Sequence, residues 1–177
     1  RSMFKFFKKN SAEPPSLRKE INEKGDGHFH TVTVKEVRRE TEDAVSIVLN
    51  LPEDGVDFSF LPGQYLTLRA NIGGEEVRRS YSVCVAPHEG ELRVAVTEIE
   101  GGKFSTYVNR ELKAGDAIES MAPTGNFTWT PTGNASHVVG WAAGSGITPV
   151  MSIAKSVLAS DDASTFTLFY GNKNSNS

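Results

Sequence analysis

The sequence predicts an all-β part followed by an α/β part: a six-stranded antiparallel Greek-key barrel, then an incomplete doubly wound domain. Between residues 29 and 127, apolar and polar residues alternate in short segments separated by turn residues, which is typical of antiparallel strands. From residue 137 an apolar segment, a glycine-containing loop and a helical pattern follow one another. That succession is typical of a β–α–β unit.

The barrel strands are expected where apolar residues recur at every second position. They cover residues 29–37, 44–51, 65–70, 76–83, 91–98 and 116–121. One helix is expected at residues 103–112, because Phe104, Val108 and Leu112 recur at helical spacing. Gly115 follows as a helix stop. Six short strands with one helix between them predict a closed antiparallel barrel.

The α/β part is expected to contain one β–α–β unit. Residues 137–143 are apolar enough for a buried parallel strand, and residues 144–149 form a tight loop. A helix at residues 150–158 and a second strand at residues 164–170 complete the unit. One such unit leaves much of its apolar surface uncovered, so we expect the second domain to be truncated.

The chain therefore divides into three segments. Residues 1–27 mix charges with proline and glycine and are expected to be a flexible leader, with one short amphipathic turn near residues 17–21. Residues 28–131 form the barrel domain. Residues 132–177 form the N-terminal part of the second domain.

Composition excludes several classes of protein. The chain has 19 basic and 22 acidic residues and a formal charge of −3, which argues against a nucleic-acid partner. No apolar run approaches the roughly 20 residues that cross a bilayer. Cys84 is the only cysteine, so the chain forms no internal disulfide, and that residue alone cannot hold zinc or an iron–sulfur cluster. We expect a cytoplasmic protein with no membrane partner and no metal site.

A first candidate site lies on the expected strand at residues 76–83. Arg79 supplies a cation for a phosphate, Tyr81 an aromatic face, and Ser82 a hydroxyl. These are the groups that a flavin nucleotide needs. An ordinary barrel strand with an exposed arginine would show the same residues.

A second candidate site lies at the start of the expected helix, at Gly101, Gly102, Lys103, Phe104 and Ser105. The N–H groups and dipole of a helix N-terminus attract anions, and glycines let a diphosphate approach closely. A glycine turn capped by a serine is the alternative. One anion site and one stacking strand, separated by another strand, suit a dinucleotide such as FAD.

A third candidate site is the loop at residues 144–149. It comprises Gly144, Ser145, Gly146, Ile147, Thr148 and Pro149. Because it follows an apolar strand and opens a helix, it has the context that a dinucleotide diphosphate site requires. The proline is compatible with the first turn of a helix.

In this order and spacing, the three motifs resemble the ferredoxin-NADP reductase superfamily. Arg79–Ser82 matches its R-x-Y-S flavin motif, and Gly144–Pro149 matches its G-x-G-x-x-P loop. The likeness covers residues 29–172. Within the superfamily it is greatest to reductase components of multicomponent oxygenases, in particular the phenylacetyl-CoA oxygenase reductase subunit type, which would place the chain in phenylacetate degradation.

The resemblance implies a role for each site residue. Arg79 would bind the FAD phosphates, Tyr81 would stack on the flavin ring, and Ser82 would lie near its N5 atom. Ser82 and Thr148 would be the catalytic residues. Further FAD contacts would come from Val96, Gly101, Gly102, Lys103, Phe104, Ser105 and Thr148. NAD(P) contacts would come from Gly144, Ser145, Gly146, Ile147, Pro149, Gly171 and Asn172.

The resemblance also implies the reaction. A flavin-dependent NAD(P)H oxidoreductase would pass electrons from NAD(P)H through FAD to an iron–sulfur centre of an oxygenase system. The [2Fe–2S] cluster would belong to a C-terminal domain that is missing here, since Cys84 is the only thiol. Two alternatives stay open. One is that the chain is a free flavin reductase, and the other is that it is a truncated FAD-binding module without turnover.

Overall fold

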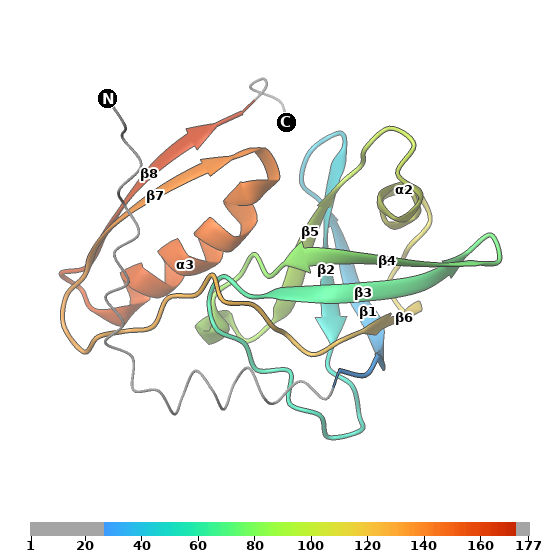
Figure 1. Ribbon diagram of the computed structural model, residues 1–177, viewed down its shortest axis with the longest axis horizontal. Coiled ribbons are helices and arrows are strands. Elements are labelled where there is room, and N and C mark those ends of the chain that lie inside the picture. Colours follow the sequence, from blue (N-terminus) through green and yellow to red (C-terminus); the bar gives the residue numbers. More distant parts are fainter. Residues whose placement is uncertain (1–26, 173–177) are drawn as a thin grey trace.

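The structure is a computed structural model that describes residues 27–172. A curled sheet makes up one side of the molecule, and a helix with two parallel strands makes up the other (Figure 1). The expected leader, including the amphipathic turn near residues 17–21, lies outside the described residues except for Gly27.

The sheet contains six antiparallel strands, as the alternating pattern predicted. The order across the sheet is β4-β3-β6-β1-β2-β5. The strands are β1 (His30–Arg39), β2 (Ala44–Asn50), β3 (Tyr65–Ile72), β4 (Glu75–Ser82), β5 (Leu92–Thr97) and β6 (Ala117–Ser120). Their ends differ by up to two residues from those expected, because pairing and not pattern decides where a strand ends.

The sheet curls until its two edge strands meet. Immediately after β4, Val83 forms an antiparallel bridge with Val94 of β5, and the Cys84 N–H donates to the Arg93 carbonyl at 3.0 Å. Both valines are fully buried. The barrel is therefore closed through this short contact, and the rest of β4 remains an edge strand of the sheet.

Helix α2 (Lys103–Arg110) covers one end of the barrel core, with Phe104 and Val108 almost completely buried. It ends two residues earlier than expected. Leu112 nevertheless packs into the core, because the N–H groups of Glu111 and Leu112 both bond to the Tyr107 carbonyl and turn the chain inward.

The second part is the expected β–α–β unit. Strand β7 (His137–Ala143) pairs in parallel with β8 (Thr165–Gly171). The 3₁₀ turn η2 (Gly144–Gly146) leads into helix α3 (Ile147–Ser160), which begins three residues earlier than expected. Pro149 therefore lies in the first turn, where a backbone N–H has no intrahelical acceptor. No helix within residues 27–172 has the length and apolar character needed to span a bilayer.

The prediction that β7 is a buried strand was wrong. Val139 is 48% exposed and Trp141 is 71% exposed, and the Trp141 ring stacks on Phe169 at 5.4 Å. Helix α3 contacts both β7 and β8. No element within residues 27–172 covers the stacked rings of Trp141 and Phe169. Apolar content alone does not tell a strand buried on both faces from one covered on a single face.

Gly63 allows the segment that leads into β3 to approach the segment at residues 124–127 closely. Its φ is +97°, and a Cβ at this position would lie 2.0 Å from the Phe127 carbonyl oxygen. The two segments are joined by reciprocal bonds between Tyr65 and Thr124, with the Tyr65 N–H at 2.9 Å and the Thr124 N–H at 3.0 Å from their acceptors. The glycine therefore fixes the entry into β3.

Replacement of Gly63 by alanine should lower the free energy of unfolding by about 2–4 kcal/mol, since both the backbone conformation and the backbone contact are violated. Gly55→Ala is the matched control, because Gly55 has a φ of +79° but open space at its Cβ position. It should cost about 1 kcal/mol. Urea midpoints give both values. Equal losses would show that the close approach to Phe127 does not matter.

Candidate cofactor site

The two cofactor residues expected on β4 face the same side of the sheet. Arg79 lies opposite Leu68 and Tyr81 lies opposite Leu66 on β3. Directly paired residues point the same way across a sheet. Ser82 lies opposite Tyr65 and points to the other side. The strand thus ends with a cation and a phenol on one face and a hydroxyl on the other.

Tyr81 is a half-buried side chain held from within the barrel. Its ring centroid lies 5.9 Å from that of Phe104 on α2, with the planes tilted by 33°. Burial raises the pKa of Tyr81 to about 12, against a lowering by the nearby Arg79 charge. The phenol is therefore neutral at physiological pH and offers a fixed aromatic surface.

Arg79 is exposed and is available to an anion. One of its guanidinium nitrogens, Nη1, donates to the Arg78 carbonyl at 2.7 Å. Within the described part of the chain it takes part in no ion pair, whereas the neighbouring Arg78 pairs with Glu76. A guanidinium without a carboxylate partner is suited to a phosphate group.

The N-terminus of α2 has no side-chain cap. Gly102 is the N-cap residue, and the N–H groups of Lys103, Phe104 and Ser105 have no acceptor within the helix, as in any first helical turn. The Lys103 ammonium pairs with Glu75 at the start of β4. The backbone groups of this turn therefore remain suited to an anion.

The side chain of Ser105 is engaged inside the loop. Its hydroxyl accepts from the Ile99 N–H at 3.2 Å and donates to the Gly102 carbonyl at 3.1 Å. A Cβ on Gly102 would lie 2.4 Å from this hydroxyl and 2.5 Å from the Ile99 side chain. Local packing is thus sufficient to explain the glycine, and Ser105 presents only its backbone N–H outward.

Two further candidate residues contribute their side chains to the core. Val96 and Phe104 are almost completely buried, and the Val96 carbonyl accepts from the Asn109 side chain at 3.0 Å. They shape the barrel wall behind the site, and their side chains do not reach its surface.

The candidate nicotinamide residues gather at the carboxyl ends of β7 and β8. Gly144 adopts a φ of +50°, and a Cβ there or on Gly146 would meet nothing within 4 Å. The Thr148 hydroxyl donates to the Ser145 carbonyl at 2.9 Å. The exposed Gly171 and Asn172 end the neighbouring strand. This is the edge of a parallel sheet at which α/β proteins bind ligands.

Sequence reasoning missed the contact that joins the two halves. The fully buried Ser152 hydroxyl donates to the Val85 carbonyl at 2.6 Å, and the Lys155 ammonium pairs with Glu89 at 2.9 Å. Ser152 lies one turn after Thr148, and Val85 lies three residues after Ser82. The end of β4 accordingly faces α3 (Figure 1).

Tyr65 was also missed. It lies opposite Ser82, is 37% exposed, and has its ring against Gly125, where a Cβ would lie 3.1 Å from the ring. The strand start at residues 62–65 was expected to lie opposite residues 79–82, as the structure has it, but no role was given to the Tyr65 ring. It adds a second aromatic surface beside the expected site.

A barrel with an uncapped helix N-terminus, joined to a β–α–β unit with an open glycine loop, defines the class of dinucleotide-dependent oxidoreductases. Residues 31–129 match the family model of the oxidoreductase FAD-binding domain, and residues 141–177 match that of the oxidoreductase NAD-binding domain. The chain belongs to the FAD-binding oxidoreductase family. The sequence resemblance is thereby confirmed, whereas the individual site residues remain predictions.

Individual relatives point the same way. A component of 1,2-phenylacetyl-CoA epoxidase from Escherichia coli K12 is 44% identical over 84% of this chain and 42% of its own length. The flavohem-like FAD/NAD-binding domain of nitric oxide dioxygenase from Vibrio cholerae is 30% identical, with a TM-score of 0.71 over 83% of this chain and 64% of that one.

Phthalate dioxygenase reductase, described as a modular structure for electron transfer from pyridine nucleotides to [2Fe–2S], is 25% identical. Its TM-score is 0.68 over 85% of this chain and 46% of that one. The chain thus spans less than half of the length of this reductase and of the epoxidase component.

The partial burial of Tyr81 predicts that its phenol loses its proton at a higher pH than an exposed tyrosine does. Because the pKa is raised in the folded protein, to about 12, and stays near 10 in the unfolded chain, the contribution of Tyr81 to stability is complete below pH 10. It is lost as the pH rises toward 12. Ultraviolet absorbance should show this phenolate forming last, and Tyr81→Phe should remove that step. A step near pH 10 that disappears in Tyr81→Phe would contradict the assignment.

Loss of the Ser152 hydroxyl should weaken the docking of α3. Ser152→Ala leaves the buried Val85 carbonyl without its partner, which costs about 1–3 kcal/mol. Ser156→Ala is the matched control, because the Ser156 hydroxyl bonds only within the helix, to the Ser152 carbonyl; it should change stability by about 0.5 kcal/mol or less. Urea unfolding and amide exchange in α3 measure both. Indistinguishable variants would contradict the docking role.

Proposed function

We propose that the chain is the flavin-binding and initial nicotinamide-binding portion of a reductase that takes electrons from NAD(P)H and delivers them to an iron–sulfur centre of an oxygenase system. The observation that carries the proposal is the placement of Arg79 and Tyr81 on one side of β4, with Tyr81 backed by the first turn of the uncapped helix α2.

Four groups of the chain fit an FAD molecule. Arg79 would bind a phosphate through its guanidinium, which has no carboxylate partner within residues 27–172, and the first-turn N–H groups of α2 would hold the diphosphate. Tyr81 would cover one face of the ring system. The Ser82 hydroxyl forms no hydrogen bond within residues 27–172, so it is available to the flavin N5 atom.

The nicotinamide-dinucleotide loop would act by positioning. The backbone of Gly144, Ser145 and Gly146 would hold a diphosphate, with Ile147, Pro149, Gly171 and Asn172 around it. Thr148 would lie between this loop and the flavin, and the Ser152–Val85 bond would keep α3 against the end of β4. Holding two reactants in one geometry replaces a bimolecular encounter.

The chemistry itself comes from the cofactor. When bound, the flavin supplies two-electron acceptance from a nicotinamide and one-electron release. The side chains of this chain bind, orient and exclude water, and none is required as a general acid or base. Ser82 would hold a hydrogen bond at N5, and Tyr81, neutral at physiological pH, would place no charge against the ring.

The acceptor is proposed from the relatives. The phenylacetyl-CoA epoxidase component and the phthalate dioxygenase reductase both serve oxygenase-type systems by name. We place the [2Fe–2S] cluster outside this chain, because Cys84 is the only cysteine here. The barrel domain would span residues 28–131 and the nicotinamide domain would start at residue 132. A cytoplasmic location would suit a carrier of reducing equivalents from NAD(P)H.

The flavin site is tested by changing Tyr81. Tyr81→Ala should weaken FAD binding about tenfold, since a stacked aromatic surface is lost, whereas Tyr81→Phe keeps the ring and should stay within about twofold. Titration of the apoprotein with FAD, followed by flavin fluorescence, measures both. Equal affinities for all three proteins would remove Tyr81 from the site.

Turnover is tested by mixing the FAD-loaded protein with NADH or NADPH in a stopped-flow instrument. Bleaching of the flavin absorbance above the free-flavin background supports the reductase. Tightly bound flavin without bleaching would make the chain a binding module only. Flavin that is lost on desalting, with bleaching of added flavin, would instead favour the free flavin reductase.

A further inference from the structure

A cavity of about 520 Å³ lies between the 51–60 loop, the ends of β2 and β5, and the 3₁₀ turn η1 (Pro87–Glu89). None of the candidate cofactor residues lines it. Its walls are formed by Lys35, Val48, Leu49, Asn50, Leu51, Val56, Asp57, Phe58, Ser59, Phe60, Pro87, Gly90, Glu91 and Leu92. The volume lies within the range of small-molecule sites.

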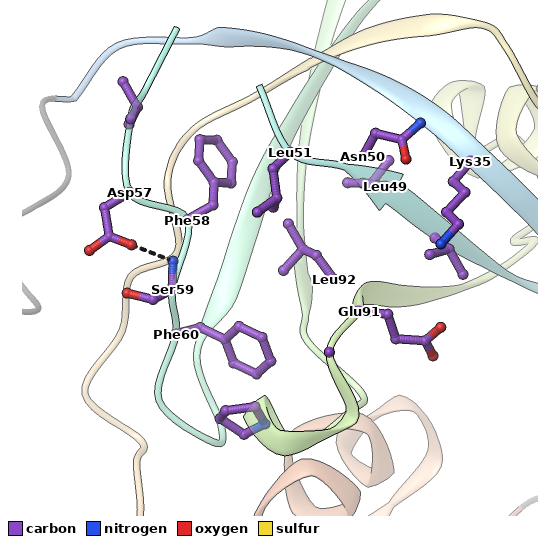
Figure 2. Close-up of a pocket in the computed structure, with 14 residues that line it drawn as sticks. Lys35, Leu49, Asn50, Leu51, Asp57, Phe58, Ser59, Phe60, Glu91 and Leu92 are labelled. Carbon is purple, nitrogen blue, oxygen red and sulfur yellow. Dashed lines mark hydrogen bonds between the residues drawn. The ribbon is translucent and has the colours of Figure 1, made fainter. Parts of the chain in front are cut away.

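The walls are mostly apolar. Figure 2 shows the side chains of Phe58, Phe60, Leu51 and Leu92 grouped around one space, with the Lys35 side chain on its far side. Two aromatic rings and several aliphatic side chains favour an occupant with an aromatic body, because aromatic pairs gain beyond the area they bury.

The wall formed by the 51–60 loop is held in place before any ligand arrives. His30 on β1 bonds through Nδ1 to the Asp54 carboxylate at 2.5 Å, and its ring meets Phe58 edge-on at 6.0 Å. Within the loop the Asp54 carboxylate also accepts from the Val56 N–H at 3.1 Å. A preformed wall lowers the entropy cost of binding.

Lys35 is the one cation among the residues that line this cavity, and its charge also acts on the neighbouring Glu36. The Glu91 carboxylate pairs with Arg93 at 3.0 Å and with Arg38 at 3.4 Å. The Asp57 carboxylate accepts from the Ser59 N–H at 2.8 Å and is turned outward in Figure 2. Lys35 is exposed and forms no hydrogen bond or ion pair within residues 27–172.

The backbone places Lys35 at this edge through an irregularity in β1. Val34 pairs with Leu49 and Glu36 pairs with Val48, so Lys35 is the extra residue of a β-bulge. A bulge re-aims a side chain and is frequent beside functional sites. We therefore infer that the cavity binds a small aromatic monocarboxylate, with its ring against Phe58 and Phe60 and its carboxylate on Lys35, at a site separate from the flavin and nicotinamide residues.

The test compares 4-phenylbutanoate with its neutral analogue 4-phenylbutanamide. The acid should bind with a Kd on the order of 1 mM, and amide-resonance shifts should concentrate at residues 35, 49–60 and 87–92. The neutral analogue should bind about two- to fivefold more weakly, which is the range for one exposed ion pair, and added salt should narrow the difference.

Three variants locate the site. Lys35→Met should bind acid and amide equally, and Lys35→Arg should restore the preference for the acid. Leu51→Trp should abolish binding of both, because Leu51 lines the cavity and is 57% exposed, so the larger ring fills the space without entering the core. Lys113→Met is the control, since Lys113 lies elsewhere and pairs with Asp116.

Each of the following results would overturn part or all of the proposal. Equal binding of acid and amide by the unaltered protein overturns the role of Lys35. Binding that survives Leu51→Trp places the ligand elsewhere and overturns the site, as does an absence of any resonance shift. The FAD titration is independent of all these results.

Discussion

The register between β3 and β4 determines which side chains of β4 the candidate cofactor site presents on each face of the sheet. Leu66 and Leu68 are completely buried and lie directly opposite Tyr81 and Arg79. A slip of one residue would turn both leucines out of the core and exchange the cation and the phenol for two serine hydroxyls. Core burial therefore fixes the orientation of the two candidate residues, Arg79 and Tyr81, although Tyr81 is only partly buried and Arg79 is exposed.

The two halves of the molecule differ in how completely their apolar residues are covered. The barrel closes around a continuous core that includes the interior valines and leucines and Phe104 from α2. In the second part, α3 buries Val150 and Val157, while the opposite face of β7 and β8 stays open within residues 27–172. The contact through Ser152 ties this less covered part to the barrel, which bears on the proposed function because that proposal gives the chain's own residues mainly a positioning role.

Much of the fold was predictable because its determinants are local. Alternation along β1 to β5 and the glycine before α2 each act over a few residues, and they identified the strands, the helix and the three motifs. Predictions failed or were lacking where distant segments decide. Whether both faces of β7 are buried depends on which other elements pack against it. The Ser152–Val85 bond joins residues 67 positions apart.

The same limit applies to the candidate site. Arg79, Tyr81 and Ser82 could be selected from residue chemistry and strand alternation. The internal use of the Ser105 hydroxyl could not, because it depends on how the loop at Ile99 folds back onto the helix start. The bulge at Lys35 likewise reflects a mismatch between two paired strands, which neither strand reveals alone.

The stacked pair formed by Trp141 and Phe169 makes this protein its own optical probe. Trp141 is one of only two tryptophans in the chain and is mostly in contact with water. An indole moved from water into an apolar surrounding emits at shorter wavelength. Intrinsic emission of the chain therefore reports directly on whether anything comes to lie over the open face of β7 and β8, without any added label.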